Sequence, residues 1–81
     1  MKGEVSNMEY NIYIIDIYGN AHFLQKATDF KSANRCCDIY FDDLYERGEI
    51  IINGTCFMKD HVYDIEMVRA DKDNYKGVRK V

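Results

Sequence analysis

Two histidines and three cysteines are the side chains of this 81-residue chain best suited to nucleophilic or metal chemistry. A catalytic nucleophile needs a base within hydrogen-bond reach, and the base needs a group that orients it. His22 follows a predicted hairpin turn and His61 lies in a predicted loop, and neither has a nucleophile beside it in the sequence. We therefore expect two ordinary histidines and a protein that is not an enzyme.

The cysteines do not form a metal-binding pattern. Zinc motifs usually pair ligands two to four residues apart. Cys36 and Cys37 are adjacent, and adjacent side chains on a helix point about 100° apart, while Cys56 stands alone. An odd and partly adjacent set also argues against a disulfide framework and favours reduced thiols in a cytoplasmic protein. We predict no bound metal, no cofactor and no intramolecular disulfide.

The carboxylates of one predicted helix offer a different chemistry, the recognition of a basic partner. Asp38 and Asp42 lie one helical turn apart and so share a face. Paired carboxylates can hold a metal ion or exchange protons, but no third ligand is evident in the sequence. The candidate partner-binding residues of this helix are Asp38, Asp42, Asp43, Tyr45 and Glu46.

A second interpretation of the same helix is a solvated surface. Arg35 lies three residues before Asp38, and Arg47 lies four residues after Asp43. Opposite charges at these spacings can pair along a helix. The sequence leaves both alternatives open, an acidic binding surface and an ordinary solvated face.

Seven tyrosines suggest a second candidate surface. Residues 10–18 alternate as a strand that is apolar on both faces, with Tyr13 on one of them. A single helix can cover one face of a sheet, so the other face needs the tails, a second copy of the chain or a protein partner. Because tyrosine is enriched at interface cores, we add Tyr13 to the candidate partner-binding residues.

The charge distribution argues against broad nucleic-acid binding. Residues 8–71 hold twelve acidic and six basic residues, a net charge of −6, whereas residues 72–81 have a net charge of +3. The basic tail could make weak electrostatic contact with nucleic acid. No apolar run approaches the roughly 18 residues that a membrane span requires, so we expect no membrane partner.

Turns and caps outline the elements that position these residues. Gly19-Asn20 and Asn53-Gly54 are typical of hairpin turns, because Gly and Asn tolerate positive φ. Asp29 is a suitable N-cap and Gly48 a suitable end for a helix over Phe30–Arg47. These turn and cap roles account for the three glycines without a phosphate-binding loop.

The predicted fold is α+β, an antiparallel sheet of four to five strands with one amphipathic helix on one face, in the order ββαβ(ββ). Residues 8–70 form a single domain, and residues 1–7 and 71–81 are expected to be flexible tails, with Met8 a possible second start. The last strand, over Val62–Arg69, is expected at an outer or edge position. The predicted core contains Ile12 or Ile15, Leu24, Ala33, Cys37, Phe41, Leu44, Ile51 and Phe57.

These features predict a small non-enzymatic binding protein that contacts a protein partner or itself through an acidic and aromatic surface. Seven Tyr, four Phe and four Met, against five Gly and no Pro, indicate an AT-rich gene. A modulator or inhibitor of a host protein, encoded by a phage or a mobile element, fits that usage. The alternatives are a small-ligand-binding module, either monomeric or oligomeric with a pocket between subunits, and a structural or assembly domain.

Overall fold

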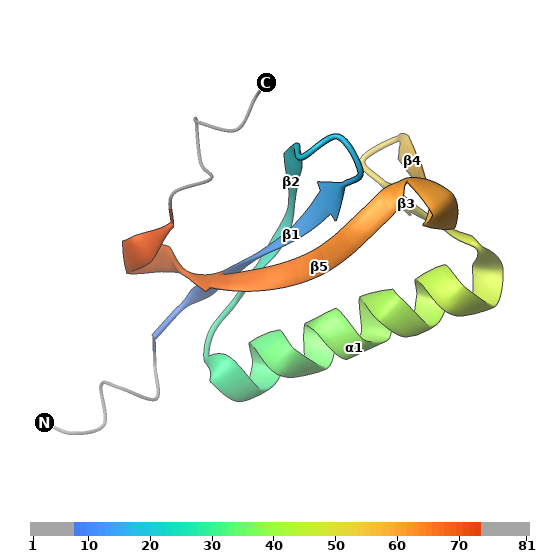
Figure 1. The fold of residues 1–81 in the computed structure, drawn as a ribbon. Helices are drawn as coiled ribbons and strands as arrows, with labels where there is room; N and C mark the ends of the chain where they lie inside the picture. The colour runs from blue at the N-terminus through green and yellow to red at the C-terminus, as the bar shows by residue number, and fades with distance from the viewer. Residues whose placement is uncertain (1–7, 74–81) are drawn as a thin grey trace, which may run out of the picture.

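A computed structural model describes residues 8–73 of the chain. One helix and two antiparallel sheets make up this part (Figure 1). The elements in chain order are β1 (Tyr10–Asp16), β2 (Ala21–Ala27), α1 (Phe30–Arg47), β3 (Glu49–Ile52), β4 (Thr55–Met58), the 3₁₀ turn η2 (Lys59–His61), β5 (Val62–Arg69) and the 3₁₀ turn η3 (Ala70–Lys72). The predicted α+β class with one helix is confirmed for these residues, and the number of strands is five, within the predicted four to five.

The strands form two sheets, so the prediction of a single sheet of four to five strands is wrong. The larger sheet has the order β2-β1-β5, and β3 pairs only with β4. Gly48 alone separates the end of α1 from the start of β3. This short link keeps β3 beside the end of the helix, and β5 takes the place next to β1 (Figure 1). β5 is an edge strand of the larger sheet, as predicted.

The helix packs on one face of the larger sheet (Figure 1). Ile12 and Ile14 of β1 are fully buried there, and Ile65 of β5 lies opposite Ile14. The complete buried cluster is Ile12, Ile14, Leu24, Ala27, Ala33, Cys37, Leu44, Ile50 and Ile65, with Phe41 and Phe57 packed partly buried against it. Ile50, and not the predicted Ile51, therefore supplies the core residue of β3.

Local capping explains why α1 begins and ends where the sequence predicts. The Oδ1 atom of Asp29 accepts a hydrogen bond of 2.8 Å from the main-chain N–H of Ser32. Gly48 has a φ of 80°, and its N–H donates to the carbonyl of Leu44 at 2.8 Å. Only glycine reaches that conformation without steric cost, so the helix stops at Arg47.

The second hairpin has the turn that the sequence predicts. Asn53 and Gly54 have φ values of 50° and 83°, as a two-residue turn of type I′ requires. The register sets Ile52 opposite Thr55 and Ile50 opposite Phe57.

The first hairpin turn is longer than the predicted pair Gly19-Asn20. Residues 17–20 separate β1 from β2, and only Gly19 has positive φ. The Oδ1 atom of Asp16 accepts the main-chain N–H groups of Tyr18 and Asn20, both at 2.9 Å. Its Oδ2 atom lies 2.9 Å from the Nε2 atom of His22. The Asp16 carboxylate therefore organises this turn.

These contacts make the turn sensitive to acid. Burial alone raises the pKa of Asp16, but hydrogen bonds from the His22 ring and from main-chain N–H groups of the turn outweigh it and lower the pKa from 3.8 to about 2. A carboxyl whose pKa is lowered by folding stabilises the fold above its unfolded pKa. That contribution is lost as the pH falls from about 4 to about 2.

We expect Asp16→Asn to lower the unfolding free energy by about 2 kcal/mol at pH 7, and the difference from wild type to disappear near pH 2. Urea unfolding followed by circular dichroism between pH 7 and pH 2 measures this difference. Asp60→Asn, at an exposed carboxylate in η2, is the matched control and should change stability by less than about 0.5 kcal/mol. A deficit of Asp16→Asn that stays constant with pH would contradict the role of the Asp16 charge.

Candidate functional site

The histidines are placed in structural roles. The Asp16–His22 pair resembles the orienting half of a catalytic triad, but the ring of His22 lies against Phe57, with centroids 5.0 Å apart. Within residues 8–73, the ring of His22 makes no hydrogen bond to a hydroxyl or a thiol. His61 is exposed, and its carbonyl accepts the N–H of Ile17 at 3.1 Å. His22 therefore serves the first turn.

The cysteines lie apart in the structure. Cys37 is buried in the core, and burial raises its pKa to about 11, so it stays protonated and packs as a small apolar side chain. Cys36 is half-buried and accepts a weak hydrogen bond from Gln25, whereas Cys56 is exposed and donates to Glu49. Among residues 8–73, no three His, Cys, Asp or Glu side chains come together as a metal-binding group.

The outer face of α1 gathers most of the predicted partner-binding residues. Asp38, Asp42, Tyr45 and Glu46 are all exposed, and helical spacing sets them on one side of the helix. Ile39 is 54% exposed and Tyr45 is 68% exposed. We call this set, Asp38, Ile39, Asp42, Tyr45 and Glu46, the outer helix face.

The carboxylates of the outer helix face keep their charges uncompensated by close partners. In the region the structure describes, none of the three acidic residues joins an ion pair within 4.0 Å, and the spacing between Arg35 and Asp38 does not produce one. The Nζ atom of Lys59 instead lies 5.4 Å from the ring centroid of Tyr45. A cation over an aromatic ring at this distance is attractive, so Lys59 holds Tyr45 at the edge of this face.

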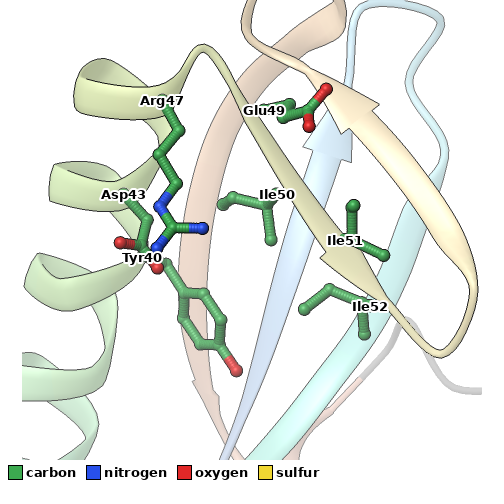
Figure 2. Close-up of a pocket in the computed structure, with 7 residues that line it drawn as sticks. All are labelled: Tyr40, Asp43, Arg47, Glu49, Ile50, Ile51 and Ile52. Carbon is green, nitrogen blue, oxygen red and sulfur yellow. The ribbon is translucent and has the colours of Figure 1, made fainter.

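Asp43 lies on a different side of the helix from Asp38 and Asp42. It lines a groove between α1 and β3, together with Tyr40 and Arg47 (Figure 2). The groove has a volume of about 220 Å³, and its other wall is Glu49–Ile52. No spacing in the sequence predicts this groove, because it depends on how β3 folds back beside the helix.

Tyr40 lines this groove and is held by a hydrogen bond. Its hydroxyl donates a 2.8 Å hydrogen bond to the Oε1 atom of Gln25 in β2. Burial, with smaller contributions from Cys36 and Asp43, raises the pKa of Tyr40, so the hydroxyl remains protonated and keeps donating. The Tyr40 ring is therefore held in one position in the lining of the groove.

Tyr13 does not lie on the surface. It is 3% exposed, and its hydroxyl donates a 2.6 Å hydrogen bond to the Oδ2 atom of Asp73. Its ring meets Phe23 edge to face, with centroids 5.7 Å apart, and Phe23 is 50% exposed. Burial of Tyr13 does not suit a contact residue, and Phe23 presents the exposed ring on that face of the sheet.

Exposed apolar side chains gather where β1, β2 and β5 meet the first hairpin turn. Ile17 and Tyr18 lie in the turn, Phe23 lies near the start of β2 and Tyr63 near the start of β5. All four are at least half exposed. Phe23 lies opposite Tyr13 in the register, and the longer first turn and a register shift after Ile12 produce this pairing, so the predicted two-residue turn could not reveal it.

No helix within residues 8–73 has the length and apolar character needed to cross a bilayer. Comparisons of the chain with family models, with curated proteins and with solved structures gave no match. We therefore infer the function from the residues and their geometry.

Proposed function

We propose that this chain is a small non-enzymatic protein that binds a protein partner through the outer helix face. The observation that carries the proposal is the mixture on that face of three exposed carboxylates without close ion-pair partners among the described residues and two largely exposed apolar side chains. Interface cores commonly combine an aromatic anchor with polar neighbours, and carboxylates select a partner of opposite charge.

The chemistry of this face points to a basic protein surface as its target. Asp38, Asp42 and Glu46 would attract lysine and arginine side chains, and Tyr45 with Ile39 would supply the apolar contact. The AT-rich residue usage of the chain supports a phage or mobile-element gene whose product modulates or inhibits a host protein. Such a protein needs no catalytic group, because occupying the target is sufficient.

A charge reversal on the outer helix face tests this function. Immobilised wild-type protein should retain a basic protein from the lysate of a low-GC bacterium at 50 mM salt, and Asp42→Lys should not. With the retained protein purified, Asp42→Lys should slow association by about tenfold at low salt, because steering by complementary charge is lost.

Asp60→Lys is the matched control for this experiment. Asp60 is an exposed carboxylate in η2, outside the outer helix face, so its reversal changes the net charge by the same amount. It should leave retention and the association rate within about twofold of wild type. Equal loss in both variants, or a wild-type protein that retains nothing, would contradict the proposed function.

A further inference from the structure

The outer side of α1 carries charges of opposite sign on its two halves. The charged residues there, two cations followed by three carboxylates, are Lys31, Arg35, Asp38, Asp42 and Glu46. All five are exposed, and helical spacing sets them in one row on the side of α1 that faces away from the larger sheet (Figure 1). Within residues 8–73, none of them joins an ion pair within 4.0 Å. We call these five residues the charged stripe.

The order of charges in the stripe does not stabilise the helix that carries it. The helix dipole favours anions in the first turn and cations in the last turn. The first turn of α1 instead holds Lys31 and no acidic residue, and Glu46 lies in the last turn. Like charges four residues apart, such as Asp38 and Asp42, also repel each other. The charged stripe is therefore better suited to a surface outside its own helix.

The charged stripe is complementary to itself when two copies of α1 run antiparallel. Arg35 and Asp42 lie three positions before and after residues 38–39, and Lys31 and Glu46 lie seven positions before and after them. A two-fold axis at this centre sets Arg35 of each copy opposite Asp42 of the other, and Lys31 opposite Glu46. A parallel pair would bring cations opposite cations, so the charges select the antiparallel arrangement.

A hollow on the N-terminal half of α1 provides space for the second copy. It has a volume of about 360 Å³ and is lined by Lys31, Ser32, Arg35, Cys36 and Ile39. Because all of these residues belong to α1, the hollow is open to solvent and only a second surface can close it. The antiparallel arrangement brings Glu46 of the second copy opposite Lys31, so its carboxylate would enter a hollow bordered by two cations.

We propose that α1 pairs antiparallel with α1 of a second copy of this chain, about a two-fold axis between residues 38 and 39. Ile39 is 54% exposed, and it would meet Ile39 of the second copy near the axis. Asp38 and Asp42 lie one helical turn apart, and a guanidinium has five N–H donors. Arg35 of the second copy can therefore bridge both carboxylates.

This dimer would regulate the proposed function, and in that respect the inference rests on it. Lys31 and Arg35 of the second copy take the place of the lysine and arginine side chains of a basic target. Dimerisation and target binding would therefore compete for Asp42 and Glu46. The charges are exposed and one side of a helix is a small interface, so we expect a dissociation constant on the order of 10 µM. A target that binds more tightly would displace the second copy.

Sedimentation equilibrium of charge-reversed variants tests the pairing. At about 50 mM salt, the wild-type protein should change from monomer to dimer between about 1 µM and about 300 µM. Arg35→Glu alone and Asp42→Arg alone should each raise the dissociation constant at least about tenfold, because each variant then faces like charges at two symmetric positions. Circular dichroism of each variant checks that it is folded.

A mixture of the two variants in equal amounts gives the decisive measurement. In the mixed dimer, the new glutamate of one chain faces the new arginine of the other, and the second contact keeps the original pair of Arg35 with Asp42. The mixture should therefore dimerise with a dissociation constant within about threefold of wild type, although neither variant does so alone. Asp60→Arg, at an exposed carboxylate in η2, is the matched control and should stay within about twofold of wild type.

Three outcomes would overturn the proposal. They are a wild-type protein that stays monomeric over this range, single variants that dimerise as wild type does, and a mixture that remains monomeric. Lysate capture separates the inference from the proposed function, because Arg35→Glu keeps every residue of the outer helix face and should retain the basic protein at least as well as wild type. A monomeric wild type whose capture depends on Asp42 would remove the inference alone. A dimer with the expected pairing that captures nothing would remove the proposed function alone.

Discussion

An Ile50→Ala variant should lose about 3 kcal/mol of unfolding free energy, while Ile51→Ala should lose less than about 1 kcal/mol. The two residues are neighbours of the same type in one strand, but Ile50 is 6% exposed and Ile51 is 63% exposed. Truncating the buried side chain removes apolar contacts with the core and leaves a cavity. Truncating the exposed one removes little, because water already reaches most of its surface.

Urea unfolding of both variants, followed by circular dichroism, measures the difference. The pair is internally matched, since the chemical change and the strand are the same in each. Equal losses, or a larger loss in Ile51→Ala, would mean that β3 presents its other face to the core.

The helix is the part of the fold that the sequence predicts best. Its bounds, Phe30–Arg47, agree with the structure because the signals that set them are local. The side chain of Asp29 accepts a hydrogen bond from the N–H of Ser32, three residues away, and the N–H of Gly48 donates to the carbonyl of Leu44 in the last turn. Contacts of this range can be inferred from spacing alone.

The arrangement of the strands could not be predicted in the same way. Asn53 and Gly54 specify the hairpin of β3 and β4, but no local signal states whether that hairpin joins the larger sheet. The answer depends on the packing of β5 against β1, between residues about fifty positions apart in the chain. Pairing at that separation leaves no trace in the spacing of neighbouring residues.

The wrong prediction that Ile51 is a core residue has a different origin, because the predicted turn already fixes which residues of the hairpin share a face. A two-residue turn at Asn53-Gly54 sets Ile51 opposite Cys56 and Ile50 opposite Phe57. Residues opposite each other in a hairpin share a face. The predicted core pair, Ile51 and Phe57, was therefore inconsistent with the predicted turn, and following the register would have selected Ile50.

For the candidate binding residues too, local spacing predicts some features, whereas others depend on residues far apart in the chain. The shared side of Asp38, Asp42 and Glu46 follows from helical spacing and could be predicted. The same spacing turns Asp43 about 100° from Asp42, but the groove beside Asp43 could not be predicted, because it forms only where β3 folds back along the helix. The burial of Tyr13 could not be predicted, since its partner Asp73 lies 60 positions further along the chain.

The hydrogen bonds of Asp73 are the basis of the last prediction. Asp73→Ala should lower the unfolding free energy by about 2 kcal/mol, although the residue lies beyond the domain boundary predicted after residue 70. The Oδ2 atom of Asp73 accepts hydrogen bonds from Asn11 at 2.7 Å and from Tyr13 at 2.6 Å. Asn11 is 1% exposed, and its Oδ1 atom has no partner in the part of the chain that the structure describes. Losing Asp73 would leave both polar atoms of that buried amide without a hydrogen bond, which costs more than removing an exposed contact.

Asp71→Ala is the matched control, because Asp71 pairs only at the surface with Arg69, where the two side chains are 49% and 43% exposed. It should change stability by less than about 0.5 kcal/mol. A double-mutant cycle of Tyr13→Phe with Asp73→Ala should give a coupling of about 1 kcal/mol or more, since the two side chains share a hydrogen bond. If Asp73→Ala unfolds at the same urea concentration as Asp71→Ala, the carboxylate does not hold the second sheet face together. Residues 8–70 would then suffice for the stability of the domain, and the burial of Asn11 and Tyr13 would need another cause.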